Sequence, residues 1–344
     1  MISIFIPTYN GEKELAKSLN SVLCQTYKDF EVLCVDDGST DGTVSILKEY
    51  ASRDSRIRLF HKQNGGSVPP SWQFIIPHIK GDHTLYMSQD DLLLPETLQL
   101  LVTRLEETGA DAVMPTEYLY FEGKNGQSKR IPIGIPTLQD KVITGKDAFR
   151  LILDYSIPGF SLWPTNIIKQ WGVPTETFNA DEYSQRLWIS QCRNVAFSTG
   201  VFLYRCDNPD AITKRHSPLH YEVVLTNAMI LSLTEEVLAH EDTLLNELAT
   251  IYFTDFFSRM LLYQQRKSKY SLSTRKKVES CFAKAHPILK KRAIAKDWKL
   301  CISKQNYTVM KAVAALKCLQ YRFKGVTLST DIDLPPITTP RKYR

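Results

Sequence analysis

The sequence has little of what defines a disulfide-bonded, zinc-binding or membrane-spanning protein. Its seven cysteines are scattered, odd in number and without a Cys-x-x-Cys pair, so neither a disulfide framework nor a zinc site is expected. No uninterrupted apolar run approaches the roughly 20 residues that a membrane-spanning helix needs. The opening residues MISIFIPTYN lack the basic segment and long apolar stretch of a signal peptide. We therefore expect a protein of the reducing cytoplasm.

Two common phosphate-binding motifs are also missing. No G-x-G-x-x-G follows the first expected strand, and GKNGQSKR at residues 123–130 lacks the spacing of a P-loop. These absences exclude a dinucleotide-dependent dehydrogenase and a P-loop enzyme.

What the chain does have is enough apolar material for a large core and an uneven charge distribution. Its 344 residues are 43% hydrophobic, which suits two domains or one domain with an appendage. Residues 266–344 hold 20 Lys or Arg against 4 acids, a net charge of +16, whereas the preceding residues carry −10. The two parts are expected to face different partners.

Short β-branched runs alternate with amphipathic helical stretches in the N-terminal part. The expected strands are Ser3–Pro7, Phe30–Val35, Ile57–Phe60 and His83–Met87. Helical periodicity between them is found at Leu15–Leu23, Thr43–Tyr50, Trp72–Ile79 and Leu98–Leu105. This alternation predicts an α/β sheet built from βαβ units, which binds ligands beyond the carboxyl ends of its strands.

Polar residues stand at three of those strand ends. PTYNGE, VDDGSTDGT and SQDD follow the first, second and fourth strands. Because adjacent carboxylates repel, Asp90 and Asp91 indicate a partner that favours negative charge.

The order and spacing of PTYN (residues 7–10), SVLCQTYKDFEVLCVDDGSTDGT (21–43) and QDD (89–91) resemble the family 2 glycosyltransferases. These are inverting enzymes that use a nucleotide-sugar donor. The resemblance implies a GT-A fold, a Rossmann-like mixed sheet flanked by helices, over residues 1–215. Residues 1–115 would be the nucleotide-sugar-binding half and 116–215 the acceptor half, followed by a basic helical region at 216–344.

The resemblance places the donor, most simply a UDP-sugar, against Pro7, Thr8 and Tyr9, with the Tyr9 ring on the base. Asp36 and Asp37 are both candidate substrate-binding residues, and the resemblance places the second, Asp37, at the base or ribose, where a carboxylate can accept a hydrogen bond from the base or from a ribose hydroxyl. The alternatives for these segments are an ordinary turn and a helix N-cap.

In the family, the last carboxylate of the Asp-containing motif usually binds a divalent metal. By resemblance, Asp91 is the ligand of Mg²⁺ or Mn²⁺, which prefer oxygen ligands, and Asp90 contacts the ribose or sugar. The alternative is a solvated pair that caps the helix starting near Pro95.

The candidate general base lies in NADEYSQRLWIS, where the family usually has an acidic pair. Asp181 is the expected base and Glu182 the second candidate; either one can instead be an acid favoured by the helix dipole. On the acceptor side, Trp163 is expected to stack on a sugar or to lie in the core. Arg205 is expected to approach the diphosphate or to form a structural salt bridge.

Two segments depart from the family pattern. NGGSVPPSWQF at residues 64–74 has two prolines where the family often has a basic residue and Asn, which weakens any donor contact from it. The segment from Glu122 to Lys146 matches nothing and is long enough to be a mobile lid.

The C-terminal region from about residue 217 has helical periodicity and an excess of Lys and Arg, as in KKRAIAKDWKLCISK. An anionic membrane surface is the preferred partner and a plain solvated face the alternative. No nucleic-acid-binding signature is present, so nucleic acid is not expected.

The favoured function is a metal-dependent inverting glycosyltransferase acting on a glycan or lipid-linked acceptor, in cell-surface polysaccharide or lipopolysaccharide synthesis. It would be cytoplasmic, at the inner face of the membrane. A nucleotidyltransferase that makes nucleotide sugars is an alternative, but PTYNGEKEL lacks the Gly-rich, Arg-containing loop of such enzymes. A catalytically inactive nucleotide-sugar-binding module is the third option.

Overall fold

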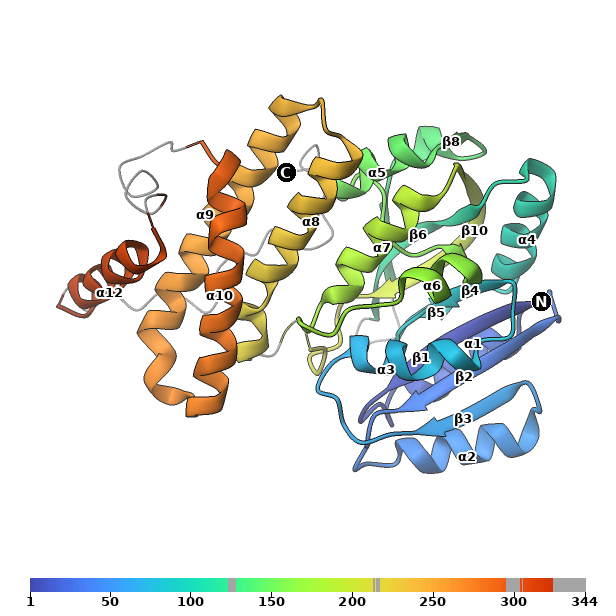
Figure 1. The fold of residues 1–344 in the computed structure, drawn as a ribbon. Helices are drawn as coiled ribbons and strands as arrows, with labels where there is room; N and C mark the ends of the chain where they lie inside the picture. Colours follow the sequence, from blue (N-terminus) through green and yellow to red (C-terminus); the bar gives the residue numbers. More distant parts are fainter. Residues whose placement is uncertain (123–127, 213, 215–216, 295–303, 305, 324–344) are drawn as a thin grey trace. The chain divides into compact units, whose positions relative to one another are not determined.

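The computed structural model describes residues 1–122, 128–212, 214, 217–294, 304 and 306–323 (Figure 1). These residues form two compact units. Unit 1 contains the described residues of Met1–Thr175 and Ser184–Pro209, and unit 2 contains Glu176–Tyr183 and the described residues from Asp210 onward. The predicted domain boundary between residues 215 and 216 stays a prediction.

Unit 1 is built on one mixed sheet. Its strands are β1 (Ile2–Thr8), β2 (Phe30–Asp36), β3 (Ile57–His61), β4 (His83–Tyr86), β5 (Leu92–Leu93), β6 (Ala112–Glu122), β7 (Ser128–Ile133), β8 (Val142–Thr144), β9 (Leu162–Pro164) and β10 (Asn194–Arg205). Their spatial order is β3-β2-β1-β4-β9-β6-β10-β5, with β7 beside β6 and β8 beside β10. The strands β3, β2, β1 and β4 run parallel, whereas β9 is antiparallel to β4 and β6. The predicted α/β fold is confirmed.

Helices connect and cover these strands (Figure 1). They are α1 (Leu15–Leu23), α2 (Thr43–Arg53), α3 (Val68–Ile75), α4 (Thr97–Thr108), α5 (Gly145–Leu153), α6 (Thr165–Trp171) and α7 (Ala180–Gln191). All seven residues of β2 are buried, as expected for a parallel strand covered on both faces. Leu15 and Leu19 of α1 pack with Ile4 and Val32 in the same core. Apolar residues spaced at the helical period of 3.6 and apolar residues spaced at the strand period of 2.0 thus form one apolar layer.

Two expectations about unit 1 need correction. The helix expected at Trp72–Ile79 is α3, which begins at Val68 and is followed by the 3-10 turn η1 (Ile76–His78). The two prolines stand in its first turn, where the missing N–H groups cost no helical hydrogen bond. The segment from Glu122 to Lys146 is not a loop throughout, because it contains β7, the 3-10 turn η2 (Pro136–Leu138) and β8. Backbone pairing of β7 with β6 and of β8 with β10 gives structure to a stretch without strong periodicity.

Unit 2 is helical, as the C-terminal periodicity predicted. After the 3-10 turn η3 (Pro218–Tyr221), its helices are α8 (Val223–Val237), α9 (Asp242–Arg266), α10 (Leu272–Arg292) and α12 (Tyr307–Phe323), with η4 (Lys267–Lys269) between α9 and α10. The helices α8, α9 and α10 pack against one another, and α12 packs against α9 and α10. Phe256 and Phe282 meet edge to face in this core, with ring centroids 5.1 Å apart.

Two further observations concern the C-terminal part. Of the basic stretch at residues 290–304, residues 295–303 lie outside the described residues. Among the described helices, none combines the length and the apolar composition needed to cross a membrane.

Candidate active site

Three loops meet at the carboxyl edge of the parallel strands. They follow β1, β2 and β4, which are neighbours in the sheet. Each loop carries one of the sequence motifs, PTYNGE, DDGSTDG or SQDD. The sheet topology therefore brings together three motifs that are up to 80 residues apart in the sequence.

The first two loops are joined by reciprocal hydrogen bonds. The Asn10 N–H donates to Ser39 Oγ at 3.0 Å, and the Thr40 N–H donates to Asn10 Oδ1 at 2.8 Å. The Gly42 N–H donates to Glu12 Oε2 at 2.7 Å. Asn10 has a φ of 46°, in the left-handed region that asparagine tolerates better than most residues. The loop that contains Asn10 and Gly11 and the loop that contains Asp41 and Gly42 are thus held together by hydrogen bonds.

Gln89 attaches the third loop to the first. Its Oε1 accepts from the Tyr9 N–H at 2.9 Å, and its Nε2 donates to the Tyr9 carbonyl oxygen at 3.0 Å. A Cβ on Gly11 would stand 2.3 Å from Gln89 Oε1, so glycine leaves room for this amide. The Tyr9 side chain itself is 47% exposed, whereas Thr8 is buried and donates through Oγ1 to the Val35 carbonyl at 3.2 Å.

The two adjacent aspartates after β2 have different surroundings. Asp36 is buried; its carboxylate accepts from the Ser39 N–H at 3.3 Å and lies 3.4 Å from His61 Nδ1. Asp37 forms an ion pair with Lys62, and its Oδ1 also accepts from the Gly65 N–H at 2.9 Å. Asp36 therefore stabilises the turn, while Asp37 is held by a cation and keeps Oδ2 without a hydrogen bond from the described residues.

The next pair, Asp90 and Asp91, is divided in a similar way. Asp91 is 1% exposed; Oδ2 accepts from the Ser88 N–H and Oδ1 from the Arg205 N–H, both at 3.0 Å. Burial, and next the Asp90 charge, raises the pKa of Asp91 well above its usual range. Asp90 is half-buried, and its Oδ2 accepts from Asn208 Nδ2 at 2.6 Å. Both oxygens of Asp91 thus accept hydrogen bonds from the backbone, whereas Asp90 keeps Oδ1 without one from the described residues. The predicted metal role of Asp91 stays a prediction.

A further carboxyl group lies in the interior near this pair. Glu117 of β6 is buried, and among the described residues only the Phe160 main chain is near enough to interact favourably with its carboxyl group, without a hydrogen bond of good geometry. Burial, and next the Asp91 charge, raises its pKa well above the usual range. A polar residue in a strand gives no sequence signal that distinguishes this buried position from a solvent-facing one.

The contacts of Arg205 favour a structural salt bridge over an approach to the diphosphate. Its guanidinium is 3.0 Å from Asp207 Oδ1 and 3.0 Å from Glu122 Oε2, and it also pairs with Glu14. Three carboxylates surround one mostly buried cation, so little positive charge is left for a diphosphate. The approach of Arg205 to the donor diphosphate stays a prediction, and these ion pairs disfavour it.

Trp163 requires a correction. It lies on β9, is 1% exposed and packs edge to face on Trp188, with ring centroids 5.8 Å apart. Trp188 in turn contacts Trp72 at 5.4 Å. An indole that is 1% exposed and packed on another indole cannot stack on a sugar, so Trp163 belongs to the core of unit 1.

The predicted base candidates stand at the start of a helix. Asp181 and Glu182 are in the first turn of α7, within the part of that helix assigned to unit 2. Arg186, further along α7, is buried and donates through Nη2 to the Ile152 carbonyl at 3.0 Å. Its guanidinium lies over the Tyr155 ring, 4.8 Å from the centroid. These contacts attach α7 to the end of α5.

Three residues at the sheet edge were given no role in the sequence analysis, although Gln89 belongs to the QDD motif: Lys62, Gln89 and Asn208. Lys62 directly follows β3 and Gln89 directly precedes the acidic pair, so position at a strand end was the available signal for both. Asn208, three residues past β10, had no such signal, because its partner Asp90 is 118 positions away in the chain.

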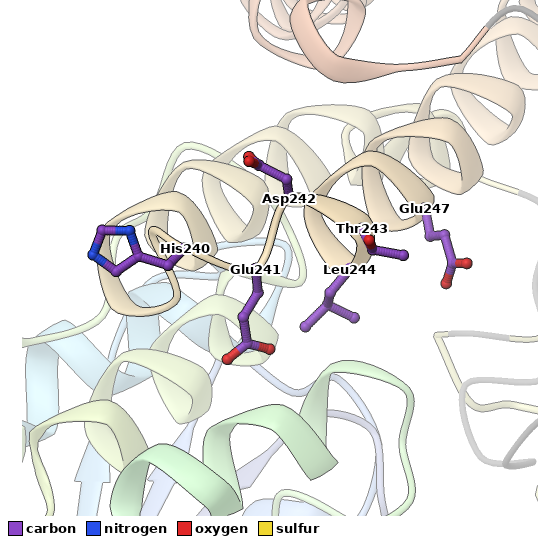
Figure 2. Close-up of a pocket in the computed structure, with 6 residues that line it drawn as sticks. All are labelled: His240, Glu241, Asp242, Thr243, Leu244 and Glu247. Atoms are coloured by element: carbon purple, nitrogen blue, oxygen red, sulfur yellow. The ribbon is translucent and has the colours of Figure 1, made fainter.

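Unit 2 has a pocket of about 450 Å³ where α8 turns into α9 (Figure 2). It is lined by His240, Glu241, Asp242, Thr243, Leu244 and Glu247. Asp242 is in the first turn of α9, where the helix dipole favours an acid. Within the described ranges, no three His, Cys, Asp or Glu side chains are grouped as a metal site. The pocket contains none of the predicted site residues.

The motifs and this geometry agree with comparisons to known proteins. Residues 3–162 match the family model described as Glycosyl transferase family 2. The chain is 32% identical over 122 residues to the glycosyltransferase GlyG of Streptococcus pneumoniae and 35% identical over 136 residues to the putative glycosyltransferase EpsE of Bacillus subtilis. These matches cover 36% and 39% of this chain, and 40% and 49% of those proteins. The chain therefore spans less than half the length of these two relatives.

Two longer matches extend beyond this segment. The cholesterol galactosyltransferase of Borreliella burgdorferi is 25% identical over 289 residues, covering 79% of this chain and 76% of that protein. Among solved structures, S. aureus TarS 1-349 in complex with UDP-GlcNAc superposes with a TM-score of 0.63 at 19% identity, covering 95% and 93% of the two chains. Residues 3–162 thus match family 2 of the glycosyltransferases, in agreement with the predicted family, and the GT-A fold is the predicted one.

Proposed function

We propose that this protein is a metal-dependent inverting glycosyltransferase that moves a sugar from a nucleoside diphosphate, most simply UDP, to a hydroxyl group of an acceptor. The observation that carries the proposal is the convergence of Tyr9, Asp37 and Asp90 on three hydrogen-bonded loops at the carboxyl edge of the sheet. Nucleotides bind at this edge in open α/β sheets. The similarity to glycosyltransferases over residues 3–162 supports the same conclusion.

The donor nucleotide is assigned to Pro7, Thr8, Tyr9 and Asp37. The exposed Tyr9 ring offers a flat face to the base, because aromatic rings stack on nucleobases. Asp37 Oδ2 can accept a hydrogen bond from the base or the ribose, and Lys62 fixes the carboxylate from the other side. Asp36 contributes by stabilising the turn that holds Asp37.

A divalent cation fits the donor set at the third loop. Asp90 is half-exposed, and its Oδ1 accepts no hydrogen bond from the described residues; Mg²⁺ and Mn²⁺ commonly take only one or two protein carboxylates. When bound, such an ion supplies positive charge to the departing diphosphate. We assign Asp90 to this ion and Asp91 to the loop itself. GDP-Man and Mn²⁺ are bound together in a Pyrobaculum calidifontis mannosyltransferase of related fold, with a TM-score of 0.50 at 15% identity.

Proton removal from the acceptor hydroxyl is assigned to Asp181, with Glu182 as the second candidate. A carboxylate within hydrogen-bond reach of the attacking hydroxyl makes it a better nucleophile and contributes about 10²- to 10⁴-fold in rate. The acid that is not the base interacts favourably with the N-terminal end of α7.

The acceptor is proposed to be a glycan or a lipid-linked molecule of the cell surface. Support comes from the cholesterol galactosyltransferase, which by its name acts on a lipid and whose similarity covers 79% of this chain. Trp163 is not part of this site, because it is buried.

One screen tests the proposal and separates its alternatives. The full chain is incubated with individual nucleotide sugars, with and without Mn²⁺, and both thermal stabilisation and nucleoside diphosphate release are measured. A transferase is stabilised by one donor and hydrolyses it slowly in a metal-dependent way. Stabilisation without turnover, on any acceptor mixture tested, would identify a binding module. Pyrophosphate release from a nucleoside triphosphate and a sugar phosphate would identify a nucleotidyltransferase.

A further inference from the structure

The last described helix of unit 2 has apolar side chains on two opposite faces. Met310, Ala314 and Cys318 of α12 are buried, and Cys318 lies against the Leu261 carbonyl of α9. On the other side, Leu316 is 66% and Leu319 is 48% exposed. With Ala312 they recur at positions i, i+4 and i+7, which is one stripe of a helix. No described residue covers this stripe.

The neighbouring helix α10 exposes a basic face. Its exposed positions include Lys276, Lys277, Lys284 and Lys291, and its single acid, Glu279, is half-buried and pairs with Lys311. Lys277 pairs with Glu222, and Lys291 is 3.7 Å from Glu235. Lys276 and Lys284 form no ion pair with the described residues. At the start of the same helix Leu272 is 73% exposed.

The two faces belong to adjacent helices. Lys311 Nζ of α12 is 3.1 Å from Glu279 Oε2 of α10, and the Tyr307 hydroxyl donates to the Glu279 carbonyl at 3.3 Å. Four of the exposed large hydrophobic residues of the described structure, namely Leu272, Ile294, Leu316 and Leu319, lie on or directly beside α10 and α12. Among its described residues, unit 2 therefore presents lysines without an ion pair on α10 and exposed leucines on the neighbouring α12.

We propose that the outer faces of α10 and α12 bind an anionic lipid bilayer. Exposed leucines on a helix enter the boundary between head groups and acyl chains, and lysines beside them are attracted to anionic head groups. A nucleic acid would use the lysines but not the leucines, since its backbone offers no apolar surface. A plain solvated face would mix charges of both signs and would not leave the leucine stripe open. This inference does not depend on the proposed function, because lipid binding requires no turnover.

The test is flotation of the full chain with lipid vesicles. Vesicles of phosphatidylcholine containing about 30% phosphatidylglycerol are compared with pure phosphatidylcholine, because an anionic leaflet attracts polybasic surfaces. Binding is expected to the anionic vesicles and to weaken steeply as salt is raised, since exposed charges are screened over about 10 Å at 0.1 M ionic strength. Binding to pure phosphatidylcholine is expected to be weak.

Two pairs of substitutions identify the surface. The double variant Lys276→Gln/Lys284→Gln should bind anionic vesicles about 10- to 30-fold more weakly, because each lysine near such a surface contributes a several-fold factor. Leu316→Ser/Leu319→Ser should weaken binding about 10-fold or more, through the loss of apolar contact with the bilayer. The matched controls are Lys48→Gln/Lys80→Gln and Val142→Ser, which change exposed side chains of unit 1; they should bind as the unchanged protein does.

All variants are checked for an unchanged melting temperature and unchanged donor hydrolysis in the absence of lipid. Equal binding to neutral and anionic vesicles, no binding at low salt, or equal effects of the control variants would overturn the proposal. A concentration-dependent dimer without lipid that disappears in Leu316→Ser/Leu319→Ser would also overturn it, because a second copy of the chain would then cover the stripe.

Discussion

The side-chain amide of Gln89 pairs with the main chain of Tyr9 as a strand neighbour would, accepting from its N–H at 2.9 Å and donating to its carbonyl at 3.0 Å. This double hydrogen bond links the loop that carries the exposed Tyr9 ring to the loop that carries Asp90. The loops that carry the groups proposed to contact the base and the metal are thereby joined before any ligand binds. Such preorganisation improves affinity by reducing the ordering that binding requires.

The first prediction concerns this link. Replacing Gln89 by Ala removes both hydrogen bonds and should raise the Kd for the nucleotide donor about 5- to 10-fold, as expected for two ordinary hydrogen bonds. The turnover number should change little. Calorimetric titration and steady-state kinetics measure the two quantities. Gln99→Ala on α4 changes an exposed glutamine away from the three loops and is the control. An unchanged Kd in Gln89→Ala would show that the link has no role in binding.

A second substitution makes that prediction sharper. Alanine at Gly11 would place its Cβ 2.3 Å from Gln89 Oε1, so Gly11→Ala should displace the amide and weaken binding by a similar factor. In the Gln89→Ala background the same substitution should have little further effect, since nothing remains to be displaced. A double-mutant cycle measures this coupling. Additive effects would indicate that Gly11 acts independently of Gln89.

The second prediction separates the two acids of the QDD motif. Asp90→Asn should abolish metal-dependent nucleotide binding while leaving the melting temperature unchanged. Asp91→Asn should instead lower the free energy of unfolding by about 1–3 kcal/mol, because its amide nitrogen would face a backbone N–H that the carboxylate now accepts. Thermal unfolding and nucleotide titration with and without Mn²⁺ distinguish the two. The reverse pattern would restore Asp91 as the metal ligand.

The third prediction concerns the general base. Asp181→Asn should bind the donor normally and lose about 10²- to 10⁴-fold in turnover, as is usual when a general base is removed. Glu182→Gln, its neighbour in the same helical turn, should remain active. If Glu182→Gln is the impaired variant and Asp181→Asn is active, the roles are exchanged. Full activity in both would remove α7 from the catalytic assignment.

The fourth prediction uses the buried Glu117. In the unfolded chain a glutamate loses its proton near pH 4.3, about the usual value, whereas burial raises the pKa of folded Glu117 well above that. Between the two values the folded protein binds more protons than the unfolded chain, so stability falls as the pH rises through this interval. Glu117→Gln removes this loss of stability, because the glutamine side chain has no charge at any pH. The substitution should therefore raise the melting temperature by at least about 2 °C at pH 8.

The pH dependence is what makes this prediction specific. The difference between Glu117→Gln and the unchanged protein should shrink as the pH falls toward the unfolded pKa, because the carboxyl group is then neutral in both states. Glu106→Gln on the exposed side of α4 is the control and should show no such trend. A constant difference at all pH values would mean that packing, and not charge, is responsible.

Much of the binding edge could be predicted because it depends on local sequence. Strand periodicity placed PTYN, DDGS and QDD at the ends of β1, β2 and β4, and parallel strands necessarily bring such ends to one edge of the sheet. Asn10 and Gly11 carry turn chemistry that is readable from their residue types. The same reasoning could not place β7 and β8, since their pairing with β6 and β10 depends on neighbours and not on their own periodicity.

By itself, the sequence determined the α/β architecture, the three loops and the acids that occupy them, because periodicity and turn chemistry are properties of neighbouring residues. The tertiary structure alone decided which hydrogen-bond and ion-pair partners each member of the two acidic pairs has. The Asp91 carboxylate accepts a hydrogen bond from the Arg205 N–H, 114 positions away, and the Asp37 carboxylate pairs with Lys62, 25 positions away. The tertiary structure also buried Trp163 against Trp188 in the core. Burial and hydrogen-bond partners arise from contacts between distant segments, and no local pattern in the chain specifies them.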